Sequence, residues 1–89
     1  MDRAPIVFPV RFATTNIAVQ TTTRELSVEG LFVRCLEPPP VGTPISLRLY
    51  LPGARESVPA GGIIRELAGA GDEPGFWADF RELGDAVRA

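Results

Sequence analysis

Asp72 and Glu73 are neighbouring residues whose types could support acid–base chemistry. A carboxylate pair acts as general acid and base when different surroundings keep one member protonated and the other ionised. Both residues fall in the glycine-rich segment 69–75, where water is expected to solvate them alike. The sequence has no histidine, and Cys35 is its sole cysteine, so no nucleophile–histidine pair or metal-ligand motif is present. We predict a protein that is not an enzyme and has no catalytic residue, metal or cofactor.

The size and composition of the chain indicate a single folded domain. Its 89 residues suffice for one hydrophobic core, and 45% of them are apolar whereas 22% are charged. These values are ordinary for a folded protein and too apolar for a disordered one. We therefore expect one domain over residues 1–89.

The charge of the chain argues against polyanionic partners. Its nine basic residues, all arginines, are outnumbered by eleven acidic residues, which gives a net charge of −2. We therefore predict no binding to a nucleic-acid polymer. No apolar run resembles a signal peptide or approaches the roughly 20 residues that cross a bilayer, and Cys35 has no partner for an internal disulfide. We expect a cytoplasmic protein without direct membrane insertion.

Hydrophobic residues recur with a period of two along most of the chain, which is typical of half-buried β-strands. This pattern predicts six strands, over residues 6–12, 17–23, 31–36, 45–51, 58–67 and 76–80. Gly61 and Gly62 predict a bulge or sharp bend within the fifth of them. Only residues 82–88 could be helical, and they would form one or two turns.

Six short strands joined by tight turns predict an all-β fold. Closure of the sheet removes the exposed strand edges that promote aggregation. The expected architecture is therefore a six-stranded antiparallel β-barrel of the split-barrel type, with at most a short C-terminal helix.

Three segments carry a resemblance to a known family. In the first, Thr23-Arg24-Glu25-Leu26-Ser27-Val28-Glu29-Gly30-Leu31-Phe32-Val33, Ser27 and Gly30 match a core motif of Asp or Asn, any residue, Ser, two further residues and Gly. The second is Pro9-Val10-Arg11-Phe12, and the third runs from Val41 to Gly53 and ends in Leu-Pro-Gly. In order and spacing these segments resemble the PilZ domain of bacterial cyclic-di-GMP signalling.

The resemblance implies a candidate ligand, cyclic di-GMP, and a candidate site. Arginine suits this ligand because its guanidinium group binds phosphate or a guanine edge bidentately and can stack on the base. PilZ receptors place an Arg-x-x-x-Arg pair before the first strand; Arg3 falls at the second position, and the first would fall before Met1. The candidate ligand-binding residues are Arg3, Arg24, Glu25, Ser27 and Gly30.

Two functions follow from the resemblance. In the first, the chain is a cyclic-di-GMP receptor in which the ligand orders the N-terminal segment. In the second, it is a PilZ-like adaptor that binds a protein of the motility or pilus machinery, with weak or lost nucleotide binding. The absent first arginine and Glu25, one methylene longer than the motif's Asp, favour the adaptor.

Some of these residues also have purely structural interpretations. Ser27 and Gly30 could form a serine-stabilised turn with the glycine at positive φ. Arg24 could pair with a neighbouring carboxylate, and Cys35 could be a packed or edge residue. Trp77 alternates with inward-pointing Phe76 and Ala78, so we expect it to face outward as a possible interaction surface.

Overall fold

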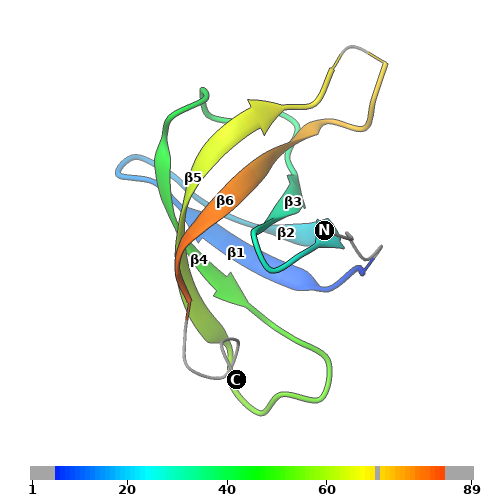
Figure 1. Cartoon of the computed structure of the whole chain (residues 1–89), viewed down its shortest axis with the longest axis vertical. Helices are drawn as coiled ribbons and strands as arrows, with labels where there is room; N and C mark the ends of the chain where they lie inside the picture. Colours follow the sequence, from blue (N-terminus) through cyan, green and yellow to red (C-terminus); the bar gives the residue numbers. More distant parts are fainter. Residues whose placement is uncertain (1–5, 70, 84–89) are drawn as a thin grey trace.

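The computed structural model describes residues 6–69 and 71–83, which form six β-strands and no helix. The strands are β1 (Pro9–Ala13), β2 (Ala18–Leu26), β3 (Gly30–Arg34), β4 (Pro44–Leu49), β5 (Val58–Leu67) and β6 (Gly75–Leu83) (Figure 1). Among these residues there is accordingly no helix that could span a membrane.

The strands close into a barrel in the order β1-β2-β3-β6-β5-β4, and every neighbouring pair is antiparallel. The segment from residue 35 to residue 43 connects β3 to β4, which are not adjacent in the sheet. The predicted all-β, six-stranded antiparallel barrel is confirmed. Because the sheet closes on itself, each strand has a hydrogen-bonded neighbour on both sides for at least part of its length.

The predicted strand boundaries differ from the observed ones by a few residues. The fifth strand is found over 58–67 as predicted, and its register shifts between Gly61 and Gly62, which confirms the bulge. The second strand continues to Leu26, beyond the predicted end at Thr23, because a bulge between Thr23 and Glu25 lets it keep pairing with β3. Of residues 82–88, which the sequence allowed to be helical, residues 82 and 83 belong to β6, and the others lie outside the described residues.

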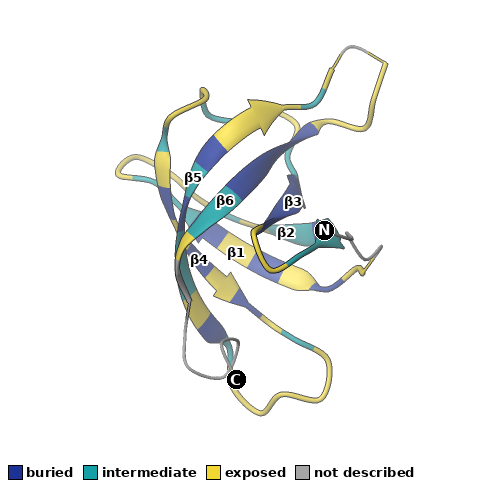
Figure 2. Ribbon diagram, viewed as in Figure 1, coloured by how far each residue is buried: buried dark blue, intermediate teal, exposed yellow. Residues whose placement is uncertain are grey.

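Alternating side chains from the strands fill the barrel interior. The pattern is clearest in β4, where buried and exposed residues alternate along the whole strand (Figure 2). Phe12 and Phe76 meet edge to face in the core, with ring centroids 5.1 Å apart. The core residues are Phe8, Val10, Phe12, Leu31, Val33, Ile45, Leu47, Leu49, Val58, Ile64, Phe76 and Ala78. Burial of each large side chain stabilises the fold by roughly 1.5–3 kcal/mol before the entropy cost of ordering it.

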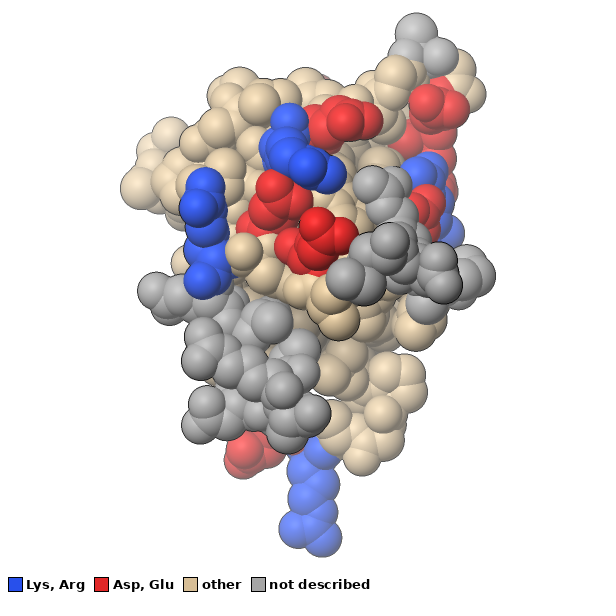
Figure 3. Space-filling model, viewed as in Figure 1, with Lys and Arg blue, Asp and Glu red and all other residues tan. Residues whose placement is uncertain are grey.

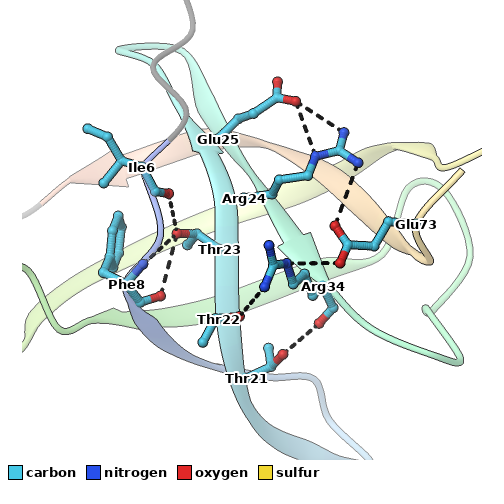
Figure 4. A network of polar contacts seen from close by, with 9 residues as sticks. All are labelled: Ile6, Phe8, Thr21, Thr22, Thr23, Arg24, Glu25, Arg34 and Glu73. Atoms are coloured by element: carbon cyan, nitrogen blue, oxygen red, sulfur yellow. Dashed lines mark hydrogen bonds and ion pairs between the residues drawn. The ribbon is translucent and has the colours of Figure 1, made fainter.

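Thr23 is a fully buried polar residue that fixes the chain entering the barrel. Its hydroxyl oxygen accepts a hydrogen bond from the Phe8 amide at 3.1 Å, and the hydroxyl donates to the Ile6 carbonyl at 2.9 Å (Figure 4). The Thr23 amide in turn donates to the Phe8 carbonyl at 2.9 Å. These bonds hold the segment before β1 against β2, next to Arg24.

Candidate ligand-binding face

The turn between β2 and β3 is built by Ser27. The Glu29 amide donates to the Ser27 Oγ at 3.1 Å, and the Ser27 amide donates to the Gly30 carbonyl at 2.9 Å. The Glu29 carbonyl also accepts a hydrogen bond from the Phe80 amide at 2.8 Å, which ties the turn to β6. The serine-stabilised turn is therefore present, with the Ser27 hydroxyl oxygen as one of its acceptors.

Gly30 is required for a reason that differs from the predicted one. The positive φ of the purely structural interpretation is wrong, since the described residues with positive φ are Gly42, Gly53 and Gly71. A Cβ on Gly30 would instead collide with the carbonyl oxygen of Ala78 and would lie 3.0 Å from the Trp77 ring. Glycine allows β3 and β6 to approach closely at this point.

An aromatic pair lies on the outer side of the barrel beside this glycine. Phe32 is directly opposite Trp77 across β3 and β6, and each ring extends diagonally over a glycine of the other strand. Trp77 covers Gly30, whereas Phe32 covers Gly75, where a Cβ would lie 2.6 Å from the Phe32 ring. The glycines thus leave room for the rings to lie flat on the sheet, an arrangement known from aromatic rescue of strand glycines.

The expectation that Trp77 is exposed is wrong. Trp77 projects outward, as the alternation of β6 predicts, yet only 5% of it is accessible to solvent, and Phe32 is 6% accessible. The Trp77 Nε1 donates to the Asp79 Oδ1 at 2.7 Å, and the Asp79 Oδ2 lies 3.4 Å from the Arg65 Nε. The indole ring is therefore buried in this structure, packed beside Gly30 and bonded to Asp79.

Arg24 lies at the β2 bulge, over the face of the Phe32 ring. Its guanidinium carbon is 3.8 Å from the ring centroid, close enough for a cation–π interaction worth roughly 0.5–1 kcal/mol at a partly exposed site. Its Nη2 is 3.1 Å from the Glu25 Oε2, and its Nη1 is 3.9 Å from the Glu73 Oε1. Arg24 is therefore stacked on one side and contacted by two carboxylates.

Arg34 extends this group of charges (Figure 4). Its Nε lies 3.2 Å from the Glu73 Oε2, in an ion pair whose geometry falls short of a hydrogen bond. Its Nη1 donates to the Thr22 Oγ1 at 3.4 Å. Two arginines thus share the surface with two glutamates, so their four formal charges sum to zero. Partly exposed pairs of this kind contribute only about 0–1 kcal/mol each to stability, but they set the local potential.

The structure brings together some of the predicted site residues. Arg24 and Glu25 are in direct contact, and Ser27 and Gly30 form the adjoining turn. Arg3 lies outside the described residues.

Three residues of this surface were not predicted from the sequence: Phe32, Arg34 and Glu73. The alternation of β3 could have placed Phe32 outward, between inward Leu31 and Val33, but no local signal indicates that Glu73, in the β5–β6 loop, reaches Arg24 and Arg34.

Comparisons with known proteins agree with this architecture. The structure of the Bacillus subtilis inhibitor of motility, MotI/DgrA, matches 94% of this chain with a TM-score of 0.79 and 14% sequence identity. The match spans 43% of the MotI/DgrA chain, so this chain spans less than half the length of that protein. The PilZ domain of CeSA from a cellulose-synthesizing bacterium matches 89% of this chain and 80% of its own, with a TM-score of 0.66 and 28% identity.

The sequence itself gives the family. No curated protein sequence matches the chain. A sequence model of the PilZ domain, in contrast, matches residues 2–89. Together with the closed six-stranded barrel and the serine-stabilised turn before β3, this match shows that the chain belongs to the PilZ domain family.

Proposed function

We propose that this PilZ domain is a non-enzymatic, cytoplasmic regulatory domain of bacterial cyclic-di-GMP signalling that binds a protein partner, with nucleotide binding weak or lost. The observation that carries this proposal is the charge balance on the outer surface that holds Arg24, Glu25, Phe32, Arg34, Glu73 and Trp77, which we call the β2–β3–β6 face. Arg24 is contacted by Glu25 and Glu73, and Arg34 is also paired with Glu73.

A dinucleotide with two phosphates needs uncompensated cations. To bind a phosphate, Arg24 would have to give up its contacts with Glu25 and Phe32, and the released carboxylates would repel the ligand. A lost or weakened charged contact costs a few kcal/mol, which corresponds to a factor of tens to thousands in affinity. This cost is large enough to raise the Kd of a micromolar site above physiological concentrations of the ligand.

The solved relatives suggest where such an adaptor acts. One of them is described as an inhibitor of motility, and another as the PilZ domain of a protein from a cellulose-synthesizing bacterium. We therefore place the protein partner in the machinery of motility, pili or another surface behaviour.

The alternative is a functional cyclic-di-GMP receptor. Two observations favour it: the Ser27 turn and Gly30 retain the geometry of a well-formed hairpin, and the guanidinium group of Arg24 is already stacked on an aromatic ring beside them. In this function the ligand would displace the carboxylates and order the N-terminal segment that includes Arg3.

Neutralising the two carboxylates tests the role of charge balance. We expect the double variant Glu25→Gln/Glu73→Gln to bind cyclic di-GMP at least about tenfold more tightly than the unaltered chain, because two charges a few ångströms from a phosphate each contribute on the order of 1 kcal/mol. Isothermal titration calorimetry measures the difference.

A matched control is available on the same chain. Glu37 and Glu56 are exposed and outside the β2–β3–β6 face, so Glu37→Gln/Glu56→Gln changes the net charge equally. An equal gain in both double variants would show that net charge, and not this face, limits binding. Tight binding by the unaltered chain with no gain in the double variant would support the receptor and contradict the adaptor.

A further inference from the structure

Arg11 and Arg48 are directly opposite each other on β1 and β4. Both are exposed, and both project from the outer side of the barrel. Like charges directly opposite on neighbouring antiparallel strands are destabilising. Neither arginine forms an ion pair with a carboxylate whose side chain the structure describes; Arg48 instead donates from Nη1 to the Ser57 Oγ at 3.2 Å. This arrangement is unfavourable in the isolated domain.

Among the described positions of β1 and β4 and those paired with them, no acidic residue compensates the two arginines. The remaining outward positions of β1 and β4, and the residues opposite them on β2 and β5, are Pro9, Ala13, Ala18, Gln20, Thr22, Pro44, Ser46, Tyr50, Pro59, Gly61 and Ile63. None of them is acidic. In the β4–β5 loop the adjacent Arg55 and Glu56 carry opposite formal charges. We call this surface the β1–β4 face.

Of the five other arginines in residues 6–69 and 71–83, three have acidic partners, whereas Arg55 and Arg81 form no ion pair with a carboxylate that the structure describes. Arg24, Arg34 and Arg65 each lie within 4.0 Å of a carboxylate. Basic and acidic side chains adjoin one another on the face that carries β5 and β6 (Figure 3). The outward positions of β1 and β4 hold Arg11, Arg48 and no acidic residue, which is a local charge of +2 on a chain whose net charge is −2.

Exposed apolar and aromatic side chains continue this face at one end. Tyr50 is 39% exposed, and its amide donates to the Pro9 carbonyl, which places these two residues side by side. Val7, 56% exposed, lies two residues before Pro9. Arginine and tyrosine are enriched in protein interfaces, where they supply much of the binding energy. The face thus combines two uncompensated cations with an apolar end.

We infer that the β1–β4 face docks an acidic segment of a protein partner. Carboxylates of the segment pair with Arg11 and Arg48, and an apolar side chain beside them packs against Val7, Pro9 and Tyr50. The inference rests on the proposed function because both require a protein partner. It adds the surface of this domain that binds the partner and the chemistry of the segment that the partner contributes. Two arginines, each contributing about 1 kcal/mol at an anionic membrane, are too few to hold an acidic domain there.

The first test measures repulsion in the isolated domain. Arg11→Glu replaces the like-charge pair with an opposite-charge pair, so we expect the melting temperature to rise by about 1–8 °C. Arg65→Glu is the control, because it breaks the pair with Asp79 and is expected to lower the melting temperature. A fall in the melting temperature of Arg11→Glu would contradict the inferred repulsion.

The second test measures docking. A synthetic peptide in which glutamates flank a central Leu-Phe pair is titrated into the ¹⁵N-labelled chain, and the same peptide with lysines in place of the glutamates serves as the reference. We expect the acidic peptide alone to shift the amide resonances of β1 and β4. Arg11→Gln/Arg48→Gln should weaken its binding at least about tenfold, whereas Arg65→Gln/Arg81→Gln, with the same loss of charge, should not.

Three outcomes would overturn the inference: no response to the acidic peptide, shifts centred on another face, or equal effects of the two double variants. Binding to phosphatidylglycerol vesicles that depends on Arg11 and Arg48 would also overturn it, in favour of a membrane. Because cyclic di-GMP is expected on the β2–β3–β6 face, a cyclic-di-GMP titration that refutes the proposed function leaves the result for the β1–β4 face unaffected.

Discussion

Gly30→Ala is expected to be among the most destabilising single substitutions in this domain. The added methyl group would collide with the Ala78 carbonyl oxygen, and it would also press against the Trp77 ring. A carbonyl oxygen within a β-ladder cannot rotate away, so the β3–β6 pairing would have to separate. We expect a loss of about 3 kcal/mol or more, at the upper end of the cost of overpacking. Chemical denaturation followed by circular dichroism measures it.

Gly69→Ala provides the matched control for this substitution. A Cβ at Gly69 would meet only the Asp72 Oδ2, at an ordinary contact distance of 3.4 Å, and Gly69 is not among the described glycines with positive φ. We expect this variant to be neutral or stabilised by up to about 1 kcal/mol, because alanine restricts the unfolded chain. A Gly30→Ala variant as stable as Gly69→Ala would show that β3 and β6 are not held at this close approach.

Phe32→Ala is expected to cost about 3–5 kcal/mol, as removal of a buried phenylalanine does in a protein core. Phe32 lies on the outer side of the barrel, but it is as buried as core residues, because it packs against Trp77, covers Gly75 and lies beneath Arg24. Its removal would expose the Trp77 indole ring and the backbone at Gly75 to solvent. The denaturation midpoint and the Trp77 emission spectrum, which should shift to longer wavelength, report the change.

Arg24→Ala separates packing from charge in the same cluster. It removes the cation–π contact and the ion pair with Glu25 but leaves both aromatic rings in place. We expect a loss of only about 0.5–1.5 kcal/mol, because partly exposed ion pairs and cation–π contacts are individually weak. A cost for Phe32→Ala no greater than that for Arg24→Ala would mean that the outer aromatic pair is not part of the packed structure.

The barrel could be predicted from the sequence because its strands follow one simple rule. Inward side chains recur at every second residue, and Gly61 and Gly62 mark the bulge in the fifth strand. The second strand was predicted to end too early because its bulge at Arg24 interrupts the alternation without a glycine to mark it. Residues 82 and 83 pair in β6 rather than forming a helix, because the neighbouring strand overrides a weak local preference.

The candidate site could be predicted only in its local part. The Ser27 turn depends on residues within three positions of one another, so the sequence contains all the information needed to propose it. The role of Gly30 and the burial of Trp77 depend on diagonal contacts between β3 and β6. The neutralisation of Arg24 and Arg34 depends on Glu73, which is 49 and 39 residues away along the chain. Contacts at such separations follow from the strand order, which no local pattern specifies.

The weak or lost nucleotide binding that we propose is tested most directly by a calorimetric titration of the unaltered chain with cyclic di-GMP. Because Arg24 and Arg34 are paired with Glu25 and Glu73, we predict no saturable heat at ligand concentrations up to about 100 μM. Saturable binding with a Kd at or below about 1 μM, abolished by Arg24→Ala, would contradict the account and identify the domain as a cyclic-di-GMP receptor.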